Sequence, residues 1–118
     1  MIAIALAFTL QAAAPEPAEL RALSAAVQAW DECLDAAARK YEPSGEPANA
    51  VAIAALFDCQ PEDLAIHNAG VEFALANSPT MSREDASERG LTQRESRLRL
   101  REWRLTQSVV AARLRARQ

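Results

Sequence analysis

The most regular pattern of hydrophobic and polar positions lies between Pro17 and Tyr41, where large apolar residues return every three or four positions. This spacing places their side chains within about 100° of one another and predicts an amphipathic helix with one buried stripe. We expect Trp30, at the centre of the stripe, to belong to the core. The stripe consists of Leu20, Leu23, Val27, Trp30, Leu34, Ala37 and Tyr41.

A second helix is predicted from about Pro47 to Cys59, because three alanines and this cysteine are spaced four, three and four residues apart. The intervening residues 42–46 include Pro43 and Gly45, which favour a turn between the two helices. We therefore expect an antiparallel helical hairpin with small side chains along its inner side.

Each helix of this hairpin carries one cysteine at the edge of a row of alanines. Cys33 lies ten residues before Pro43 and Cys59 twelve residues after Pro47, so their levels in the hairpin differ by about 3 Å of helix rise. Small neighbours allow the close backbone approach that a disulfide requires. The sequence predicts a Cys33–Cys59 disulfide, with two buried free thiols as the alternative.

The remaining ligand-type residues do not predict a metal site. The two cysteines and the lone His67 do not form a compact set of four ligands, and neither CxxC nor HxxxH occurs. A catalytic thiol would also lack a convincing histidine partner. We expect His67 to be a hydrogen-bonded residue at the edge of the core, and we expect no cofactor.

A third helix is predicted from Pro61 to about Asn77, since Pro61 is followed by two acidic residues, as is typical of a helix start. The alternative is one long helix over residues 47–77 with a kink at Pro61. In both cases residues 17–77 form an acidic helical hairpin region.

The last part of the chain predicts a long basic helix. Ser82 followed by two acids resembles a capped helix start, and we expect Gly90 to interrupt that segment. Thr92-x-x-Glu95 matches a capping box, which places the start of the last helix at Thr92 and gives it residues 92–117. Its apolar residues form two separate stripes, so we expect Trp103 to be less buried than Trp30.

Charge is divided unequally along the chain. Residues 15–88 hold four basic and fourteen acidic residues, a charge of −10, whereas residues 89–118 hold nine arginines and two glutamates, a charge of +7. The arginines are either solvated or paired with acids of the first helices, or they bind an anionic partner such as a membrane surface or an acidic protein. The candidate partner-binding residues are Arg94, Arg97, Arg101, Arg104 and Arg115.

The first fourteen residues predict export. Residues 1–14 are apolar and uncharged, too short to span a bilayer, and end in Ala12-x-Ala14, a pattern typical of a cleaved signal peptide. No basic residue precedes the apolar run, and Pro15 follows the expected cleavage site. The alternative is an apolar N-terminal helix that packs on the core. We expect residues 15–118 to be the mature protein, a single helical domain in the periplasm or secreted.

Trp30-x-x-Cys33, the alanine-rich turn around it and the alanine row ending in Cys59 resemble uncharacterised, small, alanine-rich exported helical proteins of GC-rich proteobacteria with a two-cysteine helical hairpin. This resemblance covers about residues 20–65 and assigns no functional residues.

The sequence predicts an all-α fold: a disulfide-clipped helical hairpin, a third helix and a long basic C-terminal helix. It contains no Gly-rich phosphate loop, GxSxG or HExxH motif, so we do not expect an enzyme. The favoured function is that of a non-catalytic exported binding or structural protein, which could form homo-oligomers. The alternative is an intracellular polyanion-binding or nucleic-acid-binding protein that uses the C-terminal arginines.

Overall fold

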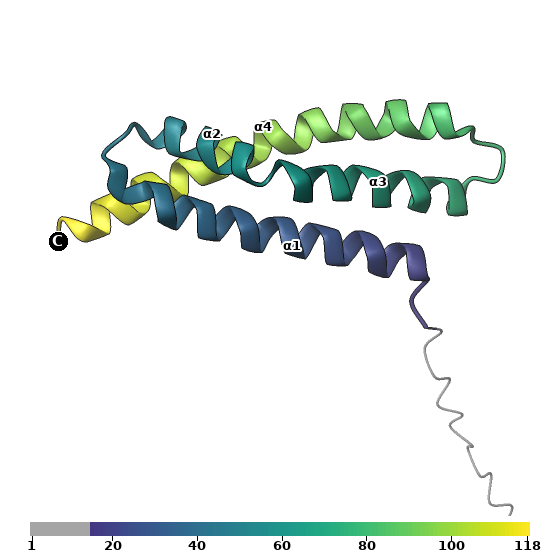
Figure 1. Cartoon of the computed structure of the whole chain (residues 1–118), viewed down its shortest axis with the longest axis horizontal. Coiled ribbons are helices and arrows are strands. Elements are labelled where there is room, and N and C mark those ends of the chain that lie inside the picture. Colours follow the sequence, from purple (N-terminus) through teal and green to yellow (C-terminus); the bar gives the residue numbers. More distant parts are fainter. Residues whose placement is uncertain (1–14) are drawn as a thin grey trace, which may run out of the picture.

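The computed structural model describes residues 15–118, and the predicted signal peptide at residues 1–14 lies outside them. The described chain is all-α, as predicted. Its elements are α1 (Ala18–Tyr41), the short 3-10 helix η1 (Glu42–Ser44), α2 (Ala48–Asp58), α3 (Gln60–Asn77) and α4 (Arg83–Ala116). The α2–α3 segment runs antiparallel to α1, and α4 turns back along α3 and α2 (Figure 1).

The α1–α2 hairpin forms where the sequence predicts it. Pro43 lies in η1, and Gly45 ends this turn with a φ of 78°, a left-handed conformation that favours glycine. Pro47 then precedes the first residue of α2. The hairpin places the end of α1 beside α2.

Residues 48–77 form two helices, α2 and α3, and not one kinked helix. The break lies at Cys59, whose φ of −98° and ψ of 19° depart from α-helical values. Pro61 has no N–H to donate and occupies the first turn of α3, a position at which proline is tolerated. The break leaves α2 against α4, and α3 against both α1 and α4.

Helix α4 differs from its prediction at one end. It begins at Arg83, where the side chain of Ser82 accepts a hydrogen bond from the N–H of Asp85 at 3.1 Å, and it continues through Gly90 without interruption. Thr92 is not a cap, because its hydroxyl donates to the backbone oxygen of Glu88 one turn earlier. The start expected at Thr92 is therefore wrong, and α4 is 34 residues long, about 51 Å.

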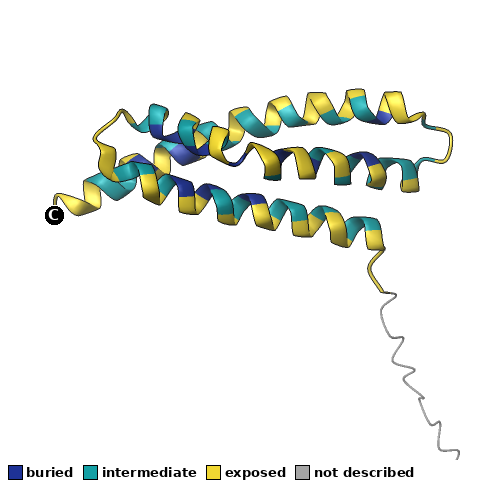
Figure 2. Ribbon diagram, viewed as in Figure 1, coloured by how far each residue is buried: buried dark blue, intermediate teal, exposed yellow. Residues whose placement is uncertain are grey.

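The core lies where α1, α2 and α4 come together, next to the start of α3 (Figure 2). Trp30 and Leu34 are almost completely buried, as the stripe on α1 predicts. Alanines fill much of the remaining interior, and their small side chains let the helices approach closely. The buried cluster consists of Trp30, Leu34, Ala37, Ala52, Ala55, Cys59, Ile66 and Leu105.

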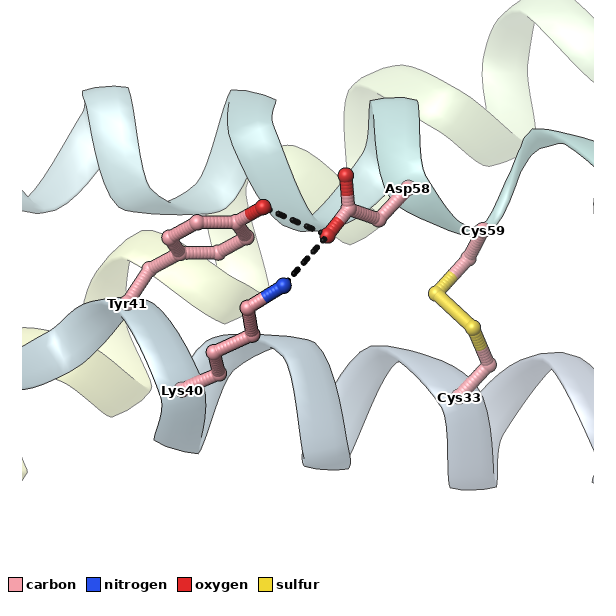
Figure 3. Close-up of a disulfide and its surroundings, with 5 residues drawn as sticks. All are labelled: Cys33, Lys40, Tyr41, Asp58 and Cys59. Atoms are coloured by element: carbon pink, nitrogen blue, oxygen red, sulfur yellow. Dashed lines mark hydrogen bonds and ion pairs between the residues drawn. A yellow bond between two sulfur atoms is a disulfide. The ribbon is translucent and has the colours of Figure 1, made fainter.

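The disulfide joins α1 to the break between α2 and α3 (Figure 3). The Sγ atoms of Cys33 and Cys59 are 2.08 Å apart and their Cα atoms 5.9 Å apart, which confirms the predicted pairing. About two turns farther along α1, Tyr41 donates a hydrogen bond to Oδ2 of Asp58 at 2.6 Å, and Lys40 lies 3.9 Å from the same oxygen. The hairpin is thus fastened at two levels.

Candidate functional site

The five candidate arginines of α4 divide into two sets that differ in burial and in their partners. Arg94, Arg97 and Arg101 turn inward and will be called the inner arginines. Arg104 and Arg115, the other two candidate residues, are exposed. The structure therefore does not bring the five predicted residues together on one solvent-facing row.

Asp63 on α3 binds two of the inner arginines. Its Oδ2 accepts from Nε of Arg94 at 2.5 Å, and its Oδ1 accepts from Nη2 of Arg97 at 2.6 Å. The Asp63 side chain is only 1% exposed, and those of Arg94 and Arg97 are about three-quarters buried. A buried carboxylate needs such partners because desolvation would otherwise be very costly. Asp63 therefore has a structural role inside the fold and is not available at the surface.

Trp30 on α1 is covered by two inner arginines. The guanidinium carbons of Arg97 and Arg101 lie 5.5 and 5.1 Å from the centre of its ring, within the range of cation–π contacts. Arg101 also pairs with the carboxylate of Asp31, the neighbour of Trp30 in the sequence. The inner arginines therefore connect α4 to α1 and α3, and their charges are paired with acids of the same molecule.

The opposite side of α4 carries an apolar stripe that no described helix covers. Leu100, Trp103, Val110 and Leu114 are 49%, 61%, 40% and 56% exposed. At 100° per residue their positions fall within about 80° of one another, and their centre lies roughly opposite the buried Leu105. The polar Gln107 interrupts the stripe at its midpoint.

Arginines border this stripe on both edges. Helical geometry places Arg99 and Arg117 along one edge, and Arg104 and Arg115 along the other. All four are exposed; Arg99 pairs with Glu95 at 2.9 Å, whereas the other three form no ion pair among the residues that the structure describes. We call the apolar stripe, Gln107 and these four arginines the outer face of α4.

The outer face is basic along its C-terminal half. No acidic residue follows Glu102 in the sequence, and four arginines do. One of them, Arg113, points away from the outer face, because its Nη2 donates to the backbone oxygen of Glu42 at 3.0 Å. The other three remain available to an external anion.

His67 lies in the contact between α3 and α4, as an edge residue would. Its Nε2 is 3.5 Å from the hydroxyl of Ser87, a weak hydrogen bond, and its Nδ1 is buried without a partner in the described chain. A Cβ built on Gly90 would lie 2.8 Å from the imidazole Cε1, so the ring occupies the space that glycine leaves. This close packing gives His67 a structural role.

Glu62 is the only described acid that lies near the disulfide as a possible third metal ligand. Ligand atoms of Cys33, Cys59 and Glu62 all fall within 4.8 Å of one another. The two sulfurs are bonded to each other, so they offer no thiolate to a metal ion. The cluster is therefore a disulfide with a neighbouring carboxylate.

The helices of the described chain include none that is long and apolar enough to cross a bilayer. Comparisons with known protein families, curated proteins and solved structures give no significant match to this chain.

Sequence reasoning missed Asp63 as the partner of the arginines, because an acid in the first helical turn beside Pro61 is explained by the helix start alone. The helical periodicity of the last helix nevertheless indicated that some of its arginines are buried. At 100° per residue, Arg94 and Arg101 lie within about 60° of Leu98 and Leu105, so they fall on the buried stripe itself. An arginine on a buried stripe needs an acid opposite it.

Proposed function

We propose that this protein is a non-catalytic, exported binding protein and that the outer face of α4 contacts its partner. The observation that carries the proposal is the exposed stripe of Leu100, Trp103, Val110 and Leu114 with arginines on both edges. Contiguous exposed apolar side chains on a small protein favour an interaction surface, and aromatic and arginine side chains are enriched in such surfaces.

A binding role is also supported by how the chemically active side chains are used. The thiols of Cys33 and Cys59 are joined in a disulfide, and Asp63 is occupied by two arginines. His67 packs against Gly90 and has only a weak contact with Ser87. Each of these groups has a structural use that accounts for its presence.

The charge of the outer face indicates an anionic partner. The basic residues of the edges attract a negative surface, while the acidic part of the chain, charge −10 over residues 15–88, would repel it. A partner that approaches α4 from outside meets the arginines first, so the charge division orients the encounter.

Site-specific photocrosslinking in the native host tests the proposal. In one variant p-benzoylphenylalanine replaces Trp103, and in a matched control it replaces Leu64, which is 49% exposed on α3. We expect adducts from position 103 and few from position 64. An equal yield at both positions, or none at position 103, would contradict a partner on the outer face.

Export has its own test. Intact-mass measurement of the protein purified from its host is expected to show the loss of about the first fourteen residues, which form the apolar run ending in Ala14. A full-length cytosolic species would overturn export, and nucleic acid would then become the natural polyanion to test.

A further inference from the structure

We propose that the partner of the outer face is the surface of an anionic phospholipid bilayer, on which α4 lies parallel to the membrane plane. This inference rests on the proposed function, and it goes further by naming the partner. In this arrangement the apolar stripe enters the boundary between headgroups and acyl chains, and the arginines contact the phosphates.

The stripe has the dimensions and composition of an interfacial helix. From Leu100 to Leu114 it extends about 21 Å along α4, and only Gln107 interrupts it. Trp103, its most exposed member at 61%, carries an apolar ring with one N–H group, which suits the headgroup region of a bilayer. Such a helix lies on a membrane and does not cross it.

The arginines lie where a bilayer would meet them. Arg99 and Arg117 border one edge of the stripe, and Arg104 and Arg115 border the other. Long side chains on both edges can extend sideways, so that the guanidinium groups reach phosphate while the stripe is immersed. Both kinds of contact can therefore form at once.

A second copy of the chain fits this face less well. Two α4 helices packed through their outer faces would bring arginines of one copy against arginines of the other, and like charges oppose such pairing. Packing α4 on the acidic α1 of another copy would be a heterologous contact that extends into filaments unless the rotation closes a ring. Neither arrangement uses the apolar stripe and the arginines together.

A nucleic acid also fits less well. Single-stranded nucleic acids stack their bases on several aromatic side chains, whereas the outer face has only Trp103 beside three aliphatic residues. Aliphatic side chains gain most from acyl chains, which remove them from water. A lipid surface is the partner that uses every residue type on this face.

Co-flotation with vesicles is the test. The mature protein, residues 15–118 with its disulfide intact, is mixed with vesicles of phosphatidylglycerol and phosphatidylcholine or with vesicles of phosphatidylcholine alone, at low and high salt. We expect binding to the anionic vesicles at low salt, a loss of binding at high salt, and little binding to the neutral vesicles. Trp103 emission should shift to the blue on binding, whereas Trp30, 1% exposed, has little room to change.

Matched variants separate the contribution of the arginines to binding from that of the apolar stripe. Arg104→Gln, Arg115→Gln and Arg117→Gln together should weaken binding by on the order of a hundredfold, since each basic residue near an anionic surface contributes about fivefold. The control triple variant removes three exposed arginines elsewhere: Arg21→Gln, Arg39→Gln and Arg83→Gln. Because both triple variants carry the same net charge, a difference between them reports the position of the arginines.

The stripe is tested in the same way. Leu100→Ser is compared with Leu64→Ser, because each leucine is 49% exposed and neither belongs to the core. We expect only Leu100→Ser to reduce binding and the blue shift, and thermal melts should confirm that all variants fold. Equal effects of the two serine variants would overturn insertion of the stripe.

A wild-type protein that binds no anionic vesicles at low salt would overturn the lipid proposal. If photocrosslinking at position 103 nevertheless yields a defined protein adduct, the proposed function stands with a protein partner. If position 103 also gives no crosslinked adduct, both the lipid proposal and the proposed function are contradicted.

Discussion

Arg94 of α4 and Asp63 of α3 are joined by a hydrogen bond of 2.5 Å between Nε and Oδ2, and the carboxylate of Asp63 is almost completely buried. This pair lies on the opposite side of α4 from Trp103 and its apolar neighbours. One helix therefore has an inner side whose charges are paired within the fold and an outer side whose charges remain exposed. The proposed function depends on this division.

Removal of the buried carboxylate should be costly. Asp63→Asn leaves Arg94 and Arg97 without a counter-charge, and we expect a loss of roughly 3 kcal/mol in the free energy of unfolding. This value is at the low end of the losses that follow from breaking a buried ion pair, because both arginines partly reach water. The control is Asp35→Asn, an exposed position on α1 with an expected change within about 0.5 kcal/mol. Urea unfolding monitored by circular dichroism measures both. Equal losses would contradict the role given to Asp63.

The two tryptophans should differ strongly in their contribution to stability. Trp30 is 1% exposed and covered by two arginines, so Trp30→Ala should cost about 3–5 kcal/mol. Trp103 is 61% exposed, and Trp103→Ala should change stability by less than about 0.5 kcal/mol. Thermal melts of the two variants give the comparison. A loss below about 1 kcal/mol for Trp30→Ala would be inconsistent with its place in the core.

The disulfide should stabilise the fold by restricting the unfolded chain. Cys33 and Cys59 are separated by 26 positions, and closing a loop of this length corresponds to about 3–4 kcal/mol in the chain-entropy model. We expect the Cys33→Ser, Cys59→Ser double variant to melt at a lower temperature with an unchanged helical spectrum. Wild-type protein in reductant serves as the control and should lose a similar amount. Labelling of both thiols by an alkylating agent in the folded, unreduced protein would refute the bridge.

Gly90→Ala should destabilise the protein, although replacing a glycine inside a helix by alanine usually stabilises it. Alanine at an internal helix position normally gains about 0.5–1 kcal/mol over glycine, and Gly70→Ala should show this gain because its Cβ would meet nothing within 4 Å. At Gly90 the new Cβ would lie 2.8 Å from the imidazole of His67, so Gly90→Ala should lose about 1–3 kcal/mol. Adding His67→Ala should restore part of that loss. A Gly90→Ala variant more stable than wild type would show that the ring moves aside freely.

Local sequence patterns predicted the features that depend on one or two neighbouring helices. The stripe around Trp30 predicted the extent and the buried side of α1, and the alanine rows beside Cys33 and before Cys59 pointed to the disulfide. The cap at Ser82 was also visible, since its side chain needs only the N–H of Asp85. These features are set by helical periodicity and by hydrogen bonds between residues close in sequence.

The features that were missed depend on contacts between distant residues. Thr92 has the sequence of a helix cap, but α4 begins at Arg83 and continues through this point along α3, and the local pattern carries no information about that packing. Likewise, spacing alone does not identify the acid that faces Arg94 and Arg97, thirty-one and thirty-four positions away at Asp63. In both cases the local pattern does not contain the contacts that α4 makes with α3.

Two double variants of α4 compare its inner side, where the arginines are paired within the fold, with its outer side, where they are exposed. Arg94→Gln with Arg97→Gln removes both partners of Asp63, whereas Arg104→Gln with Arg115→Gln removes two exposed charges, so the net charge changes equally. The measurement is thermal unfolding at one salt concentration. At about 4–8 °C per kcal/mol for a domain of this size, we expect the inner variant to melt more than about 10 °C below wild type and the outer variant to melt within about 2–3 °C of it. Equal melting temperatures for the two variants, or a larger loss from the outer one, would show that α4 is not divided into a structural inner side and a free outer side.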